Sequence, residues 1–178
     1  KLFDALGKAF PKVAMIHVPV WVNKEEKKNR EHSQRTRSFL FSALGAVVAA
    51  SVQADGIRFF ENGVVSLNFP VADEVLGARA SRTTHPQALH WFSELYSLVL
   101  NRPVAVDNPF LFKTKTEVLS VIRDHGQSEL IGLTCSCAHL MFQSKTRWHC
   151  GTCSQCIDRR IAILAAGVEA HDESHDYT

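Results

Sequence analysis

Several features that would place a chain in a common protein class are missing from these 178 residues. No apolar run approaches the roughly 20 residues that a membrane-spanning helix needs, and Lys1 to Asp4 do not begin the apolar core of a signal peptide. No cysteine occurs before residue 135, and the formal net charge is only +2. The low charge argues against a nucleic-acid-binding domain, which usually carries a strong basic patch. We therefore expect a cytoplasmic protein, not membrane-bound, without direct nucleic-acid binding.

The composition is that of an ordinary globular protein. Apolar residues make up 46% of the chain and charged residues 21%, both close to the usual values. A chain of this length can bury a substantial core. We predict one domain over residues 1–178.

The spacing of apolar residues predicts alternating helices and strands. Helices are predicted at 38–52, 86–100, 114–125 and 155–166. Strands are predicted at 13–22, 57–60, 64–67, 104–106 and 129–134. This alternation favours an α/β fold with a parallel sheet. The polar tail, 169–178, is expected to be frayed.

The cysteines form the most informative pattern. Cys150, Cys153 and Cys156 recur at every third residue, and Cys135 and Cys137 lie upstream. Four thiolates with this reach are typical of a tetrahedral zinc site, although an iron–sulfur cluster or a redox role would use the same residues. Only one of the two upstream cysteines is expected to bind the metal. A zinc site filled by four protein ligands stabilises a fold and does no chemistry of its own.

Polar residues follow the predicted strands or begin the predicted helices, where α/β proteins bind ligands. Arg35, Arg37 and Ser38 begin a helix, whose free N–H groups suit a phosphate or a carboxylate. Lys113 and Lys115 begin another, where cations oppose the helix dipole unless an anion is bound. A capped helix with two surface arginines would explain the first pattern equally well, and two solvated lysines are the alternative for the second.

Two further segments are candidates for substrate contact. Asn62 is followed by Gly63, which between apolar runs is typical of a tight hairpin. If the preceding strand is parallel, the stretch up to Asn68 would instead be a ligand-binding loop. Thr84 and its neighbours form the second segment, where helix capping is the alternative to substrate binding. Its candidate residues are Arg82, Thr84 and His85.

The C-terminal motif resembles the zinc site of the 7-cyano-7-deazaguanine synthase (QueC) family. That family has a Ser-Cys pair before Cys-Gly-x-Cys-x-x-Cys-x-x-Arg, and Ser136-Cys137 matches the pair. The resemblance therefore implies Cys137 as the fourth ligand beside the three clustered cysteines, and Arg159 matches the final arginine. The segment Thr114 to Glu117 is also similar to the family. The 12 residues between Cys137 and Cys150 exceed the family's usual spacing.

Three other stretches resemble a branch of the family found in bacterial anti-phage defence, of the QatC type. They are RTRSFLFSALGA, FFENGVVSLN and SRTTHP, which begin at residues 35, 59 and 81. The resemblance covers nearly the whole chain. It implies that residues 1–178 are the C-terminal part of a QueC-like domain, in which 135–170 form the zinc-binding segment and closing helix.

The resemblance implies a Rossmann-like ATP pyrophosphatase fold and an ATP-dependent ligase. Such enzymes adenylate a carboxylate on a deazapurine, and ammonia then displaces AMP to give an amide and, after a second round, a nitrile. The implied cofactors are zinc and, with the phosphate loop, ATP with Mg²⁺. The implied partners are a deazapurine-like molecule or a modified macromolecule, and proteins of a defence operon. The oligomeric state is left open, with a homodimer as one option.

One family feature is missing from the sequence. The family's phosphate loop, Ser-Gly-Gly-x-Asp-Ser, does not occur here, and Gly7 and Gly45 stand alone. Isolated glycines do not provide the cradle of N–H groups that phosphates need. We expect that loop to precede Lys1 and this chain alone to be inactive toward ATP. A non-catalytic, zinc-stabilised binding module for a nucleotide, a deazapurine or a partner protein is the alternative.

Overall fold

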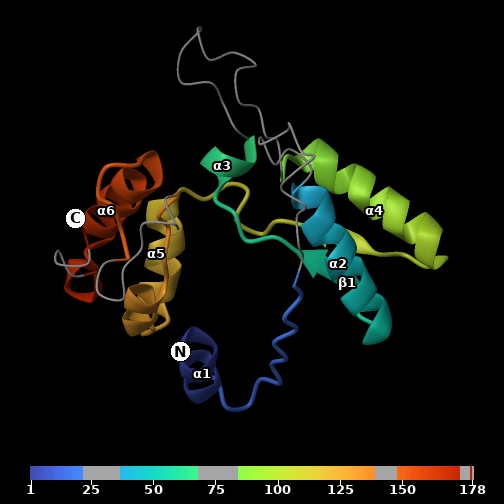
Figure 1. The fold of residues 1–178 in the computed structure, drawn as a ribbon, viewed down its shortest axis with the longest axis horizontal. Coiled ribbons are helices and arrows are strands. Elements are labelled where there is room, and N and C mark those ends of the chain that lie inside the picture. Colours follow the sequence, from blue (N-terminus) through green and yellow to red (C-terminus); the bar gives the residue numbers. More distant parts are fainter. Residues whose placement is uncertain (22–36, 68–83, 139–147, 173–176, 178) are drawn as a thin grey trace, which may run out of the picture. The chain divides into compact units, whose positions relative to one another are not determined.

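The structure, a computed structural model, describes residues 1–21, 37–67, 84–138, 148–172 and 177. It contains α-helices, short 3₁₀ helices and one parallel sheet of two strands (Figure 1). The chain divides into two compact units. We call them the metal unit (Lys1–Asn23 with Lys115–Thr178) and the strand unit (Lys24–Thr114). The mixed α/β class is confirmed, whereas the Rossmann-like fold and the single domain stay predictions.

The strand unit is built around two short parallel strands. Its elements are α2 (Arg37–Ser51), β1 (Gly56–Arg58), α3 (Gly63–Leu67), α4 (Pro86–Leu100) and β2 (Ala105–Asp107). In β1 and β2, Ile57 pairs with Val106 at the centre of the register. Because the strands are parallel, their carboxyl ends lie at the same edge of the sheet. The segments that follow Arg58 and Asp107 therefore emerge at that edge.

The core of the strand unit lies between the strands and the helices α2 and α4. It contains Ala46 from α2, Leu89 and Tyr96 from α4, and Val104 and Val106 at β2. The Tyr96 hydroxyl lies 2.6 Å from Oγ of Ser42, which is fully buried. This bond satisfies both hydroxyls, whose burial without a partner would be costly.

In the described residues of the metal unit, the regular elements are helices, apart from an isolated β-bridge between His149 and Tyr177. Its elements are α1 (Leu2–Ala9), α5 (Lys115–Asp124), η2 (Ser128–Leu133), α6 (Ser154–Ala166) and η4 (Glu169–His171). Ile131 from η2 and Ile163 from α6 are the largest apolar side chains that are fully buried. Leu119 and Ile122 of α5 pack against this cluster. A small apolar core thus joins α5, η2 and α6. No helix in the described parts of the chain is long and apolar enough to cross a membrane.

Three of the predicted strands are wrong. Residues 13–21 of the predicted strand 13–22 have no regular structure, and Ile16 is 80% exposed. Residues 64–67 belong to helix α3, and 129–133 belong to the 3₁₀ helix η2. β-branched and apolar runs indicate surfaces that suit a sheet, but they do not provide the neighbouring strand.

The Asn62–Gly63 hairpin is also wrong, and its geometry explains why. The Asn62 side chain accepts a hydrogen bond from the Val65 backbone N–H at 3.2 Å, which caps the first turn of α3. The Gly63 N–H donates to the Lys113 carbonyl at 2.8 Å. A Cβ on Gly63 would lie 2.0 Å from the Leu111 carbonyl oxygen, so only glycine fits. Contacts distant in sequence therefore outweigh the local hairpin signal.

Candidate functional site

Four cysteines of the metal unit converge on one point. The sulfur atoms of Cys137, Cys150, Cys153 and Cys156 all lie within 4.8 Å of one another. Cys150 and Cys156 have their sulfurs 3.9 Å apart. Cys156 is fully buried and Cys137 is 6% exposed. The group could hold a metal ion, and its upstream member is Cys137.

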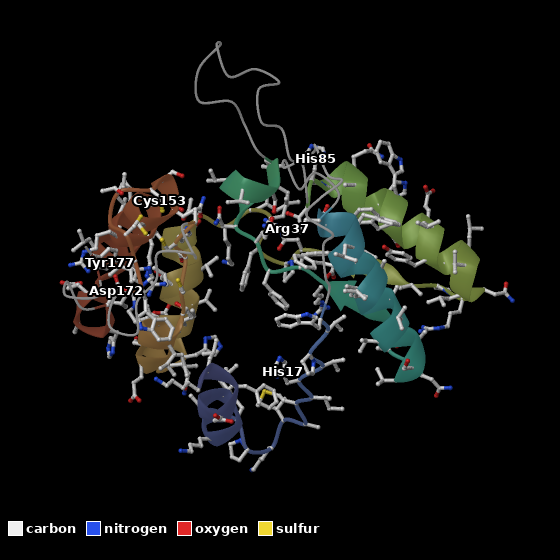
Figure 2. The ribbon with its side chains drawn as sticks, viewed as in Figure 1. His17, Arg37, His85, Cys153, Asp172 and Tyr177 are labelled. Carbon is white, nitrogen blue, oxygen red and sulfur yellow. The ribbon has the colours of Figure 1, made fainter. Side chains whose placement is uncertain are left out.

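Three of these thiols lie at the start of α6 or just before it, and Figure 2 labels Cys153 there. Cys153 is the N-cap residue of α6, and Cys156 lies in its first turn. The Cys153 backbone N–H donates to the Cys150 sulfur at 3.3 Å. Gly151 has φ of 71°, a left-handed conformation that glycine adopts without strain. The turn at Gly151 thus folds the Cys150 sulfur back onto the beginning of the helix.

The environment shifts the pKa values of two of the thiols in opposite directions. Burial raises the pKa of Cys156 to about 12, because the thiolate loses its solvation. A hydrogen bond from the backbone of Ala138 lowers the pKa of Cys153. Four thiols this close cannot all ionise without a compensating cation. A bound metal supplies that charge and deprotonates its ligands, so binding releases protons and weakens at low pH.

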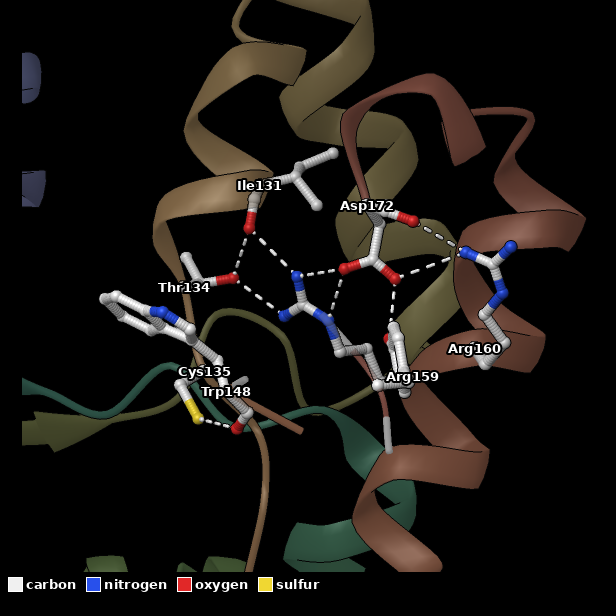
Figure 3. Close-up of polar contacts among 8 residues, drawn as sticks. Ile131, Thr134, Cys135, Trp148, Arg159, Arg160 and Asp172 are labelled. Atoms are coloured by element: carbon white, nitrogen blue, oxygen red, sulfur yellow. Dashed lines mark hydrogen bonds and ion pairs between the residues drawn. The ribbon is translucent and has the colours of Figure 1, made fainter. Parts of the chain in front are cut away.

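Cys135 lies apart from this group. It is exposed, and its thiol donates to the Trp148 carbonyl at 3.3 Å. This contact connects the segment before Cys137 to the residue two positions before Cys150 (Figure 3). Cys135 therefore has a polar contact of its own and is not one of the four converging cysteines.

Arg159, the last residue of the motif, organises a buried ion-pair network (Figure 3). Its Nε and Nη2 atoms donate to Oδ1 of Asp172 at 2.9 and 2.7 Å. The guanidinium also donates to the Ile131 carbonyl at 2.9 Å and to Oγ1 of Thr134 at 2.8 Å. The side chains of Arg159 and Asp172 are only 5% and 1% exposed. One arginine thus joins α6 to η2 and to the residue that follows η4.

The prediction of a frayed tail is wrong at Asp172 and Tyr177. The Tyr177 hydroxyl donates to Oδ2 of Asp172 at 2.6 Å, and Arg160 donates to the Asp172 backbone carbonyl at 2.8 Å. Burial and then the Asp172 carboxylate raise the pKa of Tyr177, because both disfavour the phenolate. The Tyr177 ring stacks on His149 at a centroid distance of 4.8 Å. His149 is 4% exposed, so it is a buried neighbour of Cys150.

Lys115 has an anionic partner within the protein. It lies at the start of α5, and its Nζ forms an ion pair with Oδ2 of Asp158 on α6. The Lys115 side chain is 20% exposed, whereas that of Asp158 is 52% exposed. The pair joins α5 to the helix that carries the thiols. The predicted anion-binding lysine thus has a contact that supports the metal unit.

The second polar cluster lies in the strand unit, at the carboxyl ends of β1 and β2. Thr84 donates to Oε2 of Glu61 at 2.5 Å, and its Oγ1 lies 3.0 Å from Oγ of Ser66. Nδ2 of Asn108 donates to Ser66 at 2.8 Å and to the Glu61 carbonyl at 2.7 Å. Ser66 and Thr84 are 0% and 1% exposed. The cluster brings the predicted residues Asn62 and Thr84 to one edge of the sheet.

The remaining predicted residues begin helices or precede them. Arg37, labelled in Figure 2, is the first residue of α2 and is exposed, whereas Ser38, which follows it, is buried. His85 is the N-cap residue of α4, and its Nδ1 accepts from the Gln87 N–H at 3.2 Å. Lys113 contributes its carbonyl to Gly63. The residues outside the described parts of the chain are Arg35, Asn68 and Arg82.

Four residues of these clusters were not among the individual site residues predicted from the sequence. Glu61 and Ser66 flank the expected hairpin, Asn108 follows β2, and Asp172 lies in the polar tail. For Asn108 a signal was available, because its position directly after a predicted strand is where parallel sheets bind ligands. Asp172 had no local signal, because its partner Arg159 is 13 residues away. No protein-family model, curated protein or solved structure matches this chain.

Proposed function

We propose that the four cysteines hold a structural Zn²⁺ ion and that the chain is the C-terminal part of a QueC-like ATP-dependent ligase. The convergence of the four sulfurs within 4.8 Å carries the proposal. It involves every cysteine of the Ser-Cys and Cys-Gly-x-Cys-x-x-Cys motif that the resemblance implies as a ligand. Three stretches of the chain also resemble the defence-related branch of the family.

The donor set is consistent with zinc, because four sulfurs lie within 4.8 Å of one another. A tetrahedral ion with Zn–S bonds of about 2.3 Å holds its sulfurs about 3.8 Å apart, and the Cys150 and Cys156 sulfurs are 3.9 Å apart. A multi-iron cluster places several irons between its thiolates and holds them further apart than a single ion does. With all four positions taken by protein, the zinc would bind no substrate and would contribute folding free energy.

Catalysis is proposed to depend on the residues outside the zinc site. Arg35, Arg37 and Lys113 would bind phosphates or the substrate carboxylate, since cations at helix starts suit anions. Lys115 would share this role only if it left its ion pair with Asp158. The side chains near Asn62 and Thr84, at the carboxyl ends of the parallel strands, would contact the deazapurine.

The test is AMP formation from ATP and Mg²⁺ with 7-carboxy-7-deazaguanine and ammonium. It is run on this chain and on a version with upstream sequence that carries a Ser-Gly-Gly-x-Asp-Ser loop. We expect AMP from the longer version alone, because this chain contains no such loop. Zinc content of both versions, measured by mass spectrometry of the metal, should be one ion per chain.

Absence of AMP from both versions, with zinc bound and the fold intact, would contradict the ligase. That result would favour the binding-module alternative. Iron in place of zinc, or no metal at all, would contradict the zinc site independently of the activity.

A further inference from the structure

The cluster at the carboxyl ends of β1 and β2 has a fixed hydrogen-bond direction. Asn108 is oriented by its neighbours, because the Glu61 carbonyl can only accept and the Phe110 N–H can only donate. Its amide nitrogen therefore faces the Glu61 carbonyl and Ser66, while its oxygen accepts from Phe110 at 3.0 Å. The amide donates to Ser66, whose own hydrogen is left free to donate onward.

The same reasoning fixes the direction in which the hydroxyls of Thr84 and Ser66 donate. As a carboxylate, Glu61 can only accept, so the Thr84 hydroxyl donates to it at 2.5 Å. Thr84 then accepts from Ser66 across 3.0 Å. Every proton in the chain from Asn108 through Ser66 and Thr84 points toward Glu61. Hydrogen bonds aligned in this way polarise one another and strengthen the last bond, which is the one to the carboxylate.

The hydrogen bonds of this cluster satisfy both hydroxyls, and they leave the Glu61 carboxylate able to accept further hydrogen bonds. Ser66 and Thr84 are buried, and each has a donor and an acceptor partner. Glu61 is only half-buried, and its Oε1 atom has no hydrogen-bond partner among the residues that the structure describes. A carboxylate offers about four lone-pair sites, and Thr84 uses one of them. An oriented group that can only accept is thus presented at the sheet edge where α/β proteins bind ligands.

We infer that Glu61 is a ligand-recognition residue for a group with two adjacent N–H donors. A carboxylate binds such a fork with two parallel hydrogen bonds, which is the geometry of its strongest neutral and cationic partners. The 2-aminopyrimidinone edge of a guanine-type base and a guanidinium both present this fork. The inference that the fork belongs to a deazapurine rests on the proposed function, whereas the recognition of the fork itself does not.

The test compares three probes by NMR titration of the zinc-loaded chain. The probes are 7-deazaguanine, 7-deazahypoxanthine (which lacks the 2-amino group) and methylguanidinium. We expect 7-deazaguanine to bind at least about tenfold more tightly than 7-deazahypoxanthine, as the loss of one hydrogen bond to a charged group implies. Methylguanidinium should bind weakly and shift the same resonances.

The variant Glu61→Gln should weaken 7-deazaguanine and methylguanidinium by at least about tenfold. Its amide oxygen can still accept from Thr84, while its NH₂ group meets the donors of the ligand. Glu94→Gln is the matched control, because Glu94 is an exposed carboxylate on α4 and its loss should change nothing. If Glu61→Gln unfolds, the inference is tested by the wild type alone, through its expected tenfold preference for 7-deazaguanine over 7-deazahypoxanthine.

The outcomes separate the two proposals. Equal binding of both bases, or binding of 7-deazaguanine that is unchanged in a folded Glu61→Gln variant, would overturn the role of Glu61 and leave the ligase standing. Glu61-dependent binding of methylguanidinium without any binding of the bases would support the fork-recognition site and count against the deazapurine substrate. No binding of any probe to the wild type would overturn the inference.

Discussion

The two units bury polar groups of different kinds. The metal unit buries an arginine–aspartate ion pair and holds a group of four thiols, of which two are buried and two half-buried. The strand unit buries neutral hydroxyls, linked by an amide on one side and a half-buried carboxylate on the other. The stabilisation that thiolates and ion pairs provide depends on the concentrations of metal and protons, whereas the strength of neutral hydrogen bonds depends mainly on their geometry. The comparison therefore teaches that solution conditions should control one unit and backbone packing the other.

The largest effect is expected from loss of a metal ligand. Cys153→Ser should abolish stoichiometric metal binding and unfold much of the metal unit, because a structural zinc contributes on the order of 10 kcal/mol to small domains. Metal content and hydrogen exchange would be measured together. Exchange around Tyr96, in the strand unit, should stay unchanged. Cys135→Ser is the control and should keep its metal; full stability of Cys153→Ser without metal would refute the structural role.

The next largest effect is expected at the buried ion pair. Asp172→Asn leaves the Arg159 charge buried without its counter-ion, which typically costs about 3–5 kcal/mol in free energy of unfolding. Asp124→Asn removes an exposed pair with Arg123 and should cost less than about 1 kcal/mol. Denaturant titration of both variants gives the comparison. Equal losses would mean that burial does not distinguish the two pairs.

A glycine-to-alanine substitution tests the close backbone approach in the strand unit. Gly63→Ala would place a methyl group 2.0 Å from the Leu111 carbonyl oxygen, and the backbone must shift to relieve the clash. Overpacking of this kind costs about 1–3 kcal/mol. Gly7→Ala, where a Cβ meets nothing within 4 Å, should instead stabilise helix α1 by up to about 1 kcal/mol. A Gly63→Ala variant as stable as the wild type would contradict the close approach.

The smallest effect is expected from the titration of Tyr177. Its pKa is raised in the folded state, so the unfolded phenol loses its proton first as the pH rises. The stabilisation is fully present below pH 10, the ordinary pKa of tyrosine, and is lost as the pH rises toward the folded pKa. The difference in unfolding free energy between wild type and Tyr177→Phe should fall above pH 10 by no more than about 1.4 kcal/mol per pH unit. A difference that is constant up to pH 11.5 would contradict the buried bond to Asp172.

The sequence allowed the longer helices and the thiol group to be predicted, because their signals are local. The predicted helix at 86–100 has the observed bounds of α4, where Pro86 and the apolar spacing lie within the element itself. The cysteine spacing likewise identified the three thiols at the start of α6, whereas the choice of Cys137 as the fourth came from the family resemblance. These features depend on residues close together in the chain.

The features that the sequence did not reveal depend on distant contacts. Residues 64–67 form a helix because Gly63 fits against Leu111 and because Ser66 bonds to Thr84, 18 residues away. Arg159 was noted as part of a motif, but its partners Ile131 and Asp172 lie far from it in sequence. A pattern of residue types predicts which groups need partners, and only the fold determines which partners they meet.

The arrangement of the four thiols has a consequence for how the chain can vary. Cys150, Cys153 and Cys156 come from one short turn, whereas Cys137 joins them across a connection of 12 residues. An ion held by all four closes that connection into a ring, and the entropy of ring closure changes by only about 0.6 kcal/mol for each doubling of length. A connection of twice the length would therefore leave the ligand set almost equally favourable. Insertions and deletions should accumulate there, while the spacing within the turn stays fixed.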